Sequence, residues 1–304
     1  MTVSEILVFG GLMMDRYYMV DRFPERGRDG IVLDSHDFVG GCAINMGVTI
    51  KNLGGTPYIV SYVGNDETGK KCLEYLSQMG MPEDCVRQVS GETGYCMVFV
   101  EPDGERTFLT KSGLGGDFDH ALLEGEVVGK VRVAVVTGYY LLGESGRDVV
   151  SALELLKSKG CKILFDPSPM VGYICPGVLA KVMDLANIII PNWEEGIFLA
   201  GKESPLGWAK RKGDRGHKVI LTKGSSGGFI FQEGNENRFE SVPAAVVDTT
   251  GAGDSFAGAL AFGMAQCWSL EKSVRVAVRC AAMTTEIKGP HGGFDTSWVK
   301  EDAE

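Results

Sequence analysis

The segment VVDTTGAGDSFAGAL, residues 246–260, combines an acidic residue with a small-residue turn in a spacing that suits phosphoryl chemistry. Its Gly-Ala-Gly turn stands directly before a predicted helix, and Asp254 lies in the first turn of that helix. A helix N-terminus presents unpaired backbone N–H groups and a partial positive charge, so it can hold an anion. With a phosphoryl group on the amides of Gly251, Ala252 and Gly253, Asp254 could take the proton from an attacking alcohol.

A purely structural interpretation of the same residues fits the spacing about equally well. Thr249 or Thr250 would cap the helix with a side-chain oxygen, and Asp254 would only complement the helix dipole. The segment by itself therefore leaves open whether Asp254 is a catalytic base or a partner of the dipole.

A second acidic residue follows another apolar strand, in PNWEEG at residues 191–196. Asn192 and Glu195 stand in an N-x-x-E arrangement that is typical of a capping box at a helix start. Glu195 also follows the carboxyl end of a strand, where it could approach a Mg²⁺–phosphate complex through water. The two interpretations are compatible, although the spacing alone favours the capping box.

Polar residues near the N-terminus indicate where a substrate would bind. Asp15 follows the first strand, and VGGCAIN at residues 39–45 places a glycine pair before a helix that carries Asn45. Polar groups at strand ends around a glycine-opened pocket are what a polyhydroxylated substrate needs for orientation. The structural alternative is an Asx turn at Asp15 and a tight bend at the glycine pair.

Two nucleotide-binding motifs are excluded. The segment GNDETGKK, residues 64–71, nearly matches the P-loop pattern, but Lys71 replaces the hydroxyl residue that binds Mg²⁺. Asp66 and Glu67 favour an ordinary strand-to-helix turn at this place. No GxGxxG follows a strand, which argues against a dinucleotide-binding dehydrogenase.

Composition excludes further classes of partner. The chain of 304 residues has 30 basic and 40 acidic residues, a net charge of −10 and no basic run, which argues against binding to nucleic acid or an anionic membrane. Its eight cysteines include no CxxC pair, so neither a zinc ribbon nor a dithiol redox motif is present. The apolar run near the N-terminus is too short for a signal sequence or a membrane span, and we expect a cytoplasmic protein.

Short apolar runs alternate with helical patterns along the chain, which is typical of βαβ units. The runs are continuously apolar, so we expect strands that are covered on both faces. The predicted fold is a single α/β domain over residues 1–304, with a mainly parallel central sheet flanked by helices on both faces. Strands are expected at 5–11, 56–64, 131–139, 161–167, 186–192 and 217–224, and helices at 41–55, 67–80, 147–160, 269–289 and from Asp254 onward.

Two segments, 22–41 and 93–113, interrupt this alternation and are predicted to form antiparallel strands. We expect them to form a small β lid over a pocket, at about residues 14–39 and 93–112. Arg106 lies on this lid, and a solvated strand charge is favoured for it over a contact with a substrate anion. The open edges of the lid could pair across two subunits, which predicts a homodimer.

Together these motifs resemble the ribokinase-like family of sugar and nucleoside kinases, also called the phosphofructokinase-B type. DTTGAGDSFAGAL is similar to its C-terminal signature, GGCAIN to its N-terminal Gly-Gly signature, and NWEE to its N-x-x-E motif. Their order and spacing match from about Ile6 to Gly293. The resemblance implies a ribokinase-like fold and an enzyme that transfers the γ-phosphoryl group of ATP to a hydroxymethyl group of a small carbohydrate.

The resemblance also implies roles for particular residues. Asp254 is the expected catalytic base, and the expected anion hole consists of Gly251, Ala252 and Gly253. The residues expected to contact the sugar are Asp15, Gly41 and Asn45.

Residues on the nucleotide side are implied in the same way. Asn192 and Glu195 are expected to help place Mg²⁺ and phosphate, with Glu195 acting through water. Thr222 and Gly224 are expected to border ATP. Asp248 and Thr250 match positions that hold a monovalent cation in many members, which implies K⁺.

Two departures from the family pattern bear on the substrate. Met13 stands where ribose kinases carry Asn, and Cys42 stands where they carry Lys. Both changes remove polar groups from the sugar side, so the resemblance does not point to ribose itself. A nucleoside kinase is the alternative enzyme. A non-catalytic nucleotide or sugar sensor is disfavoured, because the expected base and anion hole are both present.

Overall fold

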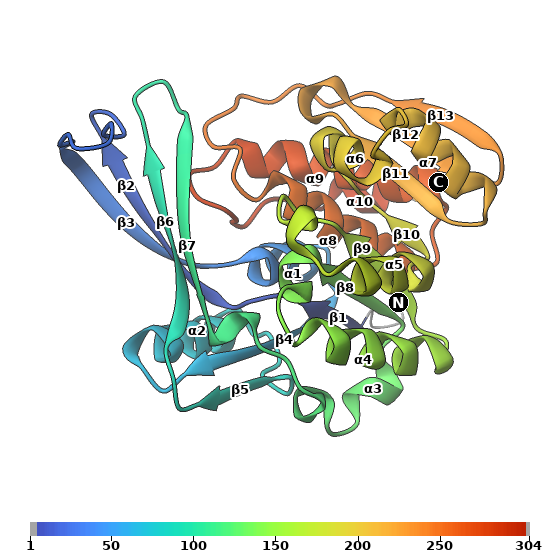
Figure 1. The fold of residues 1–304 in the computed structure, drawn as a ribbon, viewed down its shortest axis with the longest axis horizontal. Coiled ribbons are helices and arrows are strands. Elements are labelled where there is room, and N and C mark those ends of the chain that lie inside the picture. Colours follow the sequence, from blue (N-terminus) through green and yellow to red (C-terminus); the bar gives the residue numbers. More distant parts are fainter. Residues whose placement is uncertain (1–4, 302–304) are drawn as a thin grey trace.

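The computed structural model describes residues 5–301, and its centre is a nine-stranded, mainly parallel β-sheet (Figure 1). The strand order is β13-β12-β11-β10-β9-β8-β1-β4-β5, and β12 is the strand that runs antiparallel to its neighbours. The strands are β1 (Glu5–Phe9), β4 (Thr56–Gly64), β5 (Val86–Val89), β8 (Val133–Thr137), β9 (Lys162–Asp166), β10 (Ile188–Ile189), β11 (Lys218–Thr222), β12 (Gly228–Gln232) and β13 (Asn235–Phe239). Every strand predicted for the central sheet is present, which confirms the expected α/β fold.

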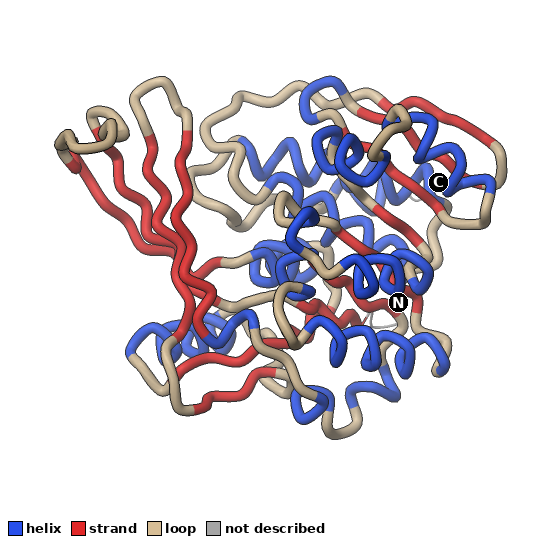
Figure 2. The backbone as a smooth tube through the Cα atoms, viewed as in Figure 1, coloured by secondary structure: helices blue, strands red, loops and turns tan. Residues whose placement is uncertain are grey.

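The strands are continuously apolar because both faces of the sheet are buried. Along β1, Ile6 and Val8 belong to one hydrophobic core and Leu7 and Phe9 to another, and all of these side chains are fully buried. Successive side chains of a strand point to opposite faces, so each face requires its own helical layer. Figure 2 shows helices on both sides of the sheet.

The helices divide between the two cores. The layer over Ile6 and Val8 contains α1 (Cys42–Asn52), α2 (Glu67–Gln78), α8 (Ala252–Ala265), α9 (Leu270–Thr285) and α10 (Trp298–Glu301). The layer over the other face contains α3 (Val127–Lys130), α4 (Gly146–Ser158), α5 (Pro176–Leu185), α6 (Trp193–Ala200) and α7 (Pro205–Asp214). Helices α5 and α7 were not predicted, although a proline in the first turn is a start signal for each. None of the helices within residues 5–301 is long and apolar enough to cross a membrane.

A separate four-stranded sheet, here called the small sheet, stands beside the main body (Figure 1). It consists of β2 (Met13–Val20), β3 (Val32–Gly40), β6 (Thr93–Val100) and β7 (Arg106–Gly113), in the order β3-β2-β6-β7. The pairs β2–β3 and β6–β7 are antiparallel as predicted, whereas β2 and β6 pair in parallel. Residues 21–31, which include part of a predicted strand, form no strand, because Pro24, Gly27 and Gly30 interrupt the extended chain.

Helix α8 is held in place by small residues on its buried face. A Cβ added to Gly258 would lie 2.6 Å from the main-chain oxygen of Met46 in α1, so glycine is required for this close approach. Residues 255–264 of α8 are all buried. Helix α8 therefore packs directly against α1, and this packing fixes the position of its N-terminus.

Candidate active site

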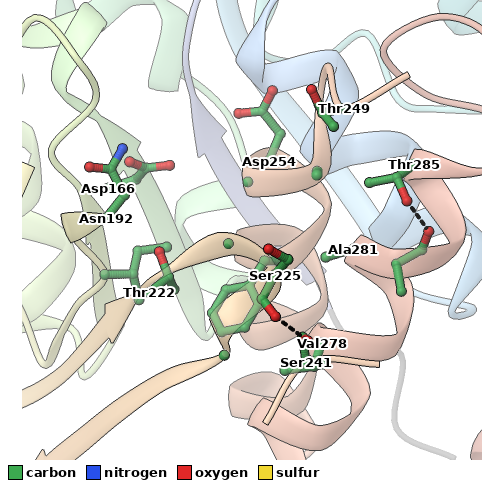
Figure 3. Close-up of a pocket in the computed structure, with 18 of the residues that line it drawn as sticks. Asp166, Asn192, Thr222, Ser225, Ser241, Thr249, Asp254, Val278, Ala281 and Thr285 are labelled. Carbon is green, nitrogen blue, oxygen red and sulfur yellow. Dashed lines mark hydrogen bonds between the residues drawn. The ribbon is translucent and has the colours of Figure 1, made fainter. Parts of the chain in front are cut away.

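A cavity of about 860 Å³ lies at the carboxyl ends of the strands on the β8 side of the sheet. The chain order of the strands reverses between β1 and β8, and ligands of open α/β sheets bind at such a reversal. Polar residues at the ends of successive strands line one wall, namely Thr137 of β8, Asp166 of β9, Asn192 after β10 and Thr222 of β11. The opposite wall is the start of α8, which carries Asp254 (Figure 3).

The start of α8 is open to an anion and is not capped by a side chain. Gly251 is the N-cap residue, has a φ of 76° and is joined by no side-chain cap bond. A Cβ at Gly251 would lie 1.8 Å from the Pro290 oxygen, so this turn requires glycine. A Cβ at Gly253 would meet no atom within 4 Å, which leaves space beside the first N–H groups of the helix. The alternative of a cap by Thr249 or Thr250 is therefore wrong.

Asp254 is held by a side chain from α1. Its Oδ2 accepts a hydrogen bond of 2.7 Å from Asn45 Nδ2. The pKa of the Asp254 carboxyl is raised to about 7, mainly by burial and also by the charges of Asp166 and Asp15, while hydrogen bonds from Asn45 and Cys42 oppose the rise. A carboxyl group with a pKa near 7 is partly ionised at neutral pH and is suited to proton transfer.

The residues predicted to contact a sugar gather near Asp254, although they do not line the 860 Å³ cavity. Asp15 of β2 is 7% exposed, and burial raises its pKa to about 7 against an opposing hydrogen bond from the Gly41 backbone. A Cβ at Gly40 would lie 2.1 Å from Asp15 Oδ2, so the glycine pair lets the start of α1 approach this carboxyl group. The fold thus brings Asp15, Gly41 and Asn45 together from two segments of the chain.

Asp166, which sequence reasoning did not single out, lies beside Asn192 on the wall opposite Asp254 (Figure 3). Burial raises the pKa of Asp166, and burial together with the charge of Asp166 raises the pKa of Glu195. Two carboxyl groups that repel each other beside a cavity suit a divalent cation, and Mg²⁺ prefers oxygen ligands. The signal that could have identified Asp166 is its place at the end of the predicted strand CKILFDP.

The capping box predicted for the N-x-x-E segment is present. Asn192 is the N-cap of α6, its Oδ1 accepts from Glu195 N at 2.9 Å, and Glu195 Oε2 accepts from Asn192 N at 3.0 Å. The other carboxylate oxygen, Glu195 Oε1, accepts from Asn192 Nδ2 at 2.8 Å. Both residues also line the cavity. The capping box therefore orients an acidic residue that a ligand can reach.

Thr222 at the end of β11 and Gly224 just after it, which were predicted to border a nucleotide, line the cavity. Thr222 forms an isolated parallel bridge with Asn192, which ties this part of the wall to the start of α6. Here Ser241 Oγ donates a hydrogen bond of 2.6 Å to the Ser225 main-chain oxygen (Figure 3). The remaining lining at this end is apolar and includes Phe239, Val242, Phe256, Val278 and Ala281.

Asp248 lies in the turn before α8 and is 4% exposed. Its Oδ1 accepts from Thr250 N at 2.8 Å, and its Oδ2 accepts from Gly289 N at 3.0 Å. Arg106 of the small sheet places Nη2 2.9 Å from Asp248 Oδ1, and its Nη1 donates to Thr249 Oγ1 at 3.1 Å. The expectation of a solvated charge at Arg106 is wrong, because only 15% of its side chain is exposed. No local pattern in the sequence indicates this contact.

These features define an α/β fold with an acidic residue at a helix start that can hold an anion, beside a cavity, which is an arrangement suited to phosphoryl transfer. A family model, pfkB family carbohydrate kinase, matches residues 3–296. The chain is 29% identical to ribokinase of Arabidopsis thaliana, over 93% of this chain and 76% of that protein. It is 27% identical to the uncharacterized sugar kinase YegV of Escherichia coli, over 96% of this chain and 91% of that protein.

Solved structures agree with this likeness. The structure of Arabidopsis thaliana ribokinase complexed with ribose and ATP has a TM-score of 0.84 at 24% identity, and the match covers 100% of both chains. The nucleoside kinase of Burkholderia thailandensis in complex with inosine has a TM-score of 0.81 at 21% identity, with 95% of this chain and 92% of that chain covered. The chain belongs to the pfkB family of carbohydrate kinases. It is an ATP-dependent kinase with the ribokinase-like fold.

We predict that Asp254→Asn stabilises the protein at alkaline pH. The carboxyl pKa rises from an ordinary value of 3.8 to about 7 in the folded protein, so ionisation costs more there than in the unfolded chain. Stability therefore falls as pH rises from about 4 to about 7 and stays low above it. The neutral amide removes this cost, so the variant should exceed the wild type by on the order of 1–3 kcal/mol at pH 8 and by less at pH 5.

Urea unfolding of both proteins at the two pH values measures this difference. Asp214→Asn is the matched control, because Asp214 is exposed and its ion pair with Lys210, one helical turn away, lies at the surface. A gain in stability that is equal at pH 5 and pH 8 would contradict the assignment.

Proposed function

We propose that the protein transfers the γ-phosphoryl group of ATP to a hydroxymethyl group of a small carbohydrate, with Asp254 as the catalytic base. The observation that carries this proposal is the arrangement of a carboxyl group with a pKa of about 7 in the first turn of α8, facing a cavity with acidic residues on its other wall. Asp254 and the acidic wall opposite it belong to the same single α/β domain.

Asp254 accepts the proton of the substrate hydroxyl as that oxygen attacks the phosphoryl group. The hydrogen bond from Asn45 stabilises the ionised carboxylate and holds its second oxygen toward the substrate. Burial, together with the charges of Asp166 and Asp15, acts in the opposite sense and raises the pKa of the carboxyl group, so that it is basic enough to accept a proton near neutral pH.

The anion hole consists of the backbone N–H groups of Gly251, Ala252 and Gly253. The open space at Gly253 and the uncapped helix start support this assignment, because a phosphoryl oxygen needs donors that no side chain already uses. Thr222 and Gly224 border ATP. The apolar side chains of Val242, Phe256 and Ala281 are suited to the purine ring.

Mg²⁺ would be held at the wall where Asp166 and Glu195 repel each other, with Glu195 acting through water and Asn192 orienting it. When bound, Mg²⁺ neutralises negative charge on the phosphates of ATP. The raised pKa values of the two acids support this site, because a cation would relieve the repulsion between them.

The sugar binds beside Asp254, where Asp15, Gly41 and Asn45 supply polar groups. Met13 packs in the core of the small sheet, and Cys42 lies against Asp254, so neither supplies a charged group to the substrate. We therefore propose a carbohydrate that is less polar than ribose at this end. A nucleoside is the second candidate, because its base replaces the anomeric hydroxyl group of the sugar with a flat aromatic ring.

The small sheet, about residues 14–39 and 93–112, serves as the lid. It supplies Asp15 from β2 and lies over the start of α8 through the contacts of Arg106. Closing such a lid excludes water from ATP and limits its hydrolysis.

We expect Asp254→Asn to lower kcat for sugar phosphorylation by about 10²- to 10⁴-fold, because the amide cannot accept a proton. ATP should bind with a Kd within about threefold of the wild-type value, since the anion hole is made of backbone groups. A coupled assay of ADP release and calorimetric titration with ATP and Mg²⁺ measure the two quantities. Near-normal turnover of the variant would rule out the role of Asp254.

The same assay with a panel of pentoses, hexoses and nucleosides identifies the substrate class. A kcat/KM that is highest for a sugar other than ribose supports the proposal. A highest value for a nucleoside establishes the second candidate. Absence of turnover with every member of both classes, in a protein that binds ATP, would contradict the proposed function.

The pH profile of kcat/KM should rise with pH and level off above about 7, because the base acts in its ionised form. In Asn45→Leu the apparent pKa should move upward, since the hydrogen bond from Asn45 favours the carboxylate. Asn237→Leu, at an exposed position on β13, should leave the profile unchanged. A profile that falls between pH 6 and pH 8 would contradict the assignment.

We propose that the lid also forms a homodimer. Ile31, Val32 and Leu33 at one edge of the small sheet and Phe108 and Leu109 at the other have exposed fractions between 48% and 64%. Light scattering after size-exclusion chromatography should give about twice the chain mass of 32.7 kDa. Leu33→Lys should shift the mass toward that of one chain, whereas Leu155→Lys on α4 should not. A single-chain mass of the wild type would refute the dimer.

A further inference from the structure

Asp248 is a buried carboxylate that joins two loops around the anion hole. It accepts one backbone hydrogen bond from Thr250, in the turn before α8, and one from Gly289, in the loop after α9. The two loops also touch directly, because Gly251 lies against the Pro290 oxygen so closely that no Cβ fits. Movement of the Asp248 side chain would therefore displace the turn that presents the first N–H groups of α8.

A buried carboxylate requires a positive partner, and the small sheet supplies one. Arg106, the first residue of β7, reaches across to place its guanidinium 2.9 Å from Asp248 Oδ1. The exposed fractions of the two side chains are 15% and 6%, so the pair is largely withdrawn from water. Arg106 also donates to Thr249 Oγ1 at 3.1 Å. Figure 1 shows the loops before α8 and after α9 extending toward β7.

This arrangement does not fit a free monovalent cation at Asp248. The carboxylate oxygens already receive two backbone N–H groups and a guanidinium, and the guanidinium carries the charge that K⁺ would bring. A cation as large as K⁺ beside Arg106 would meet a like charge at short range. Asp248, one of the two expected K⁺ ligands, thus already has an arginine as its cationic partner.

We propose that Arg106, a residue of the lid, supplies the positive charge that Asp248 requires, in place of a free cation. Through this contact Arg106 couples the position of the lid to the geometry of the anion hole. Arg106 is a positioning residue, since it acts on the reaction through Asp248 and the turn at Gly251. The inference rests on the proposed function in that the anion hole is taken to bind the phosphoryl group. The dependence of the turn at Gly251 on the position of the lid does not require catalysis.

This dependence concerns the movement of the lid. If the small sheet swings away, Arg106 leaves, and the Asp248 carboxylate loses its cationic partner while the backbone of the two loops still holds it, which is unfavourable. The turn that forms the anion hole is then stable only when the lid is in place. Tyr17 of β2 adds a second contact from the same sheet, because its hydroxyl lies beside the Thr250 side chain. An enzyme built in this way holds a competent anion hole only in the closed state.

The variants Arg106→Ala and Arg106→Lys test the proposal, with Lys111→Ala as the matched control. Lys111 lies on the same strand, but its ion pair with Glu92 is exposed. Arg106→Ala should lower kcat at least about tenfold, because a buried charge loses its partner. Arg106→Lys should retain intermediate activity, because an ammonium keeps the charge but cannot make both contacts. Lys111→Ala should behave as the wild type.

The decisive readout is the response to added cations at constant ionic strength. Wild-type activity should be the same in K⁺, Na⁺ and tetramethylammonium salts. Arg106→Ala should recover severalfold in K⁺ or guanidinium and should not recover in tetramethylammonium. Severalfold activation of the wild type by K⁺ would overturn the proposal, and so would an Arg106→Ala protein that no cation rescues.

Hydrogen exchange of the proteins without substrate separates this inference from the proposed function. Amides of residues 93–113 and of the turn before α8 should exchange severalfold faster in Arg106→Ala than in the wild type and in Lys111→Ala. Unchanged exchange in both segments would overturn the coupling even if the enzyme phosphorylates a sugar. Faster exchange in a protein that phosphorylates nothing would support the coupling and refute the proposed function alone.

Discussion

The close packing of α8 is the constraint on which the site depends. A helix can direct its first N–H groups at a ligand only if its axis is held firmly, and here the main chain of α1 holds it at Gly258 and the Pro290 oxygen holds it at Gly251. The small residues along α8 are therefore required by the geometry of its N-terminus. A larger side chain at either glycine would move the helix and, with it, both Asp254 and the turn before it.

Burial of acidic residues at the site lowers the stability of the folded chain. Asp15, Asp166, Glu195 and Asp254 are carboxyl groups whose pKa values are all raised, and burial is the largest cause for each. Each ionised group lowers the stability of the folded chain at neutral pH. Such a cluster is expected where a protein must bind a cation and move a proton. A bound cation then offsets the unfavourable ionisation of the buried carboxyl groups.

A buried ion pair joins the small sheet to the turn before α8. Arg106 and Asp248 lie far apart along the chain, and their contact joins a sheet edge to the turn before α8. A buried pair of this kind adds little net stability, because desolvation of both charges offsets their attraction. The pair instead fixes the position of the small sheet relative to the turn before α8, because either partner alone would be an unpaired buried charge.

The sequence by itself determined six strands of the central sheet, about half of the helices, the family and the acidic residue in the first turn of the small-residue helix. It could do so because apolar periodicity and motif order are local properties of the chain. The strands β5, β12 and β13 and several short helices were not predicted. Only the tertiary structure decided that no side chain caps α8, that Asp166 faces Asp254 across the cavity and that Arg106 pairs with Asp248. The bond from Asn45 to Asp254 spans 209 residues and that from Arg106 to Thr249 spans 143, so no local rule of helix or turn spacing could specify them. Such contacts follow from the order in which the sheet brings its strand ends together.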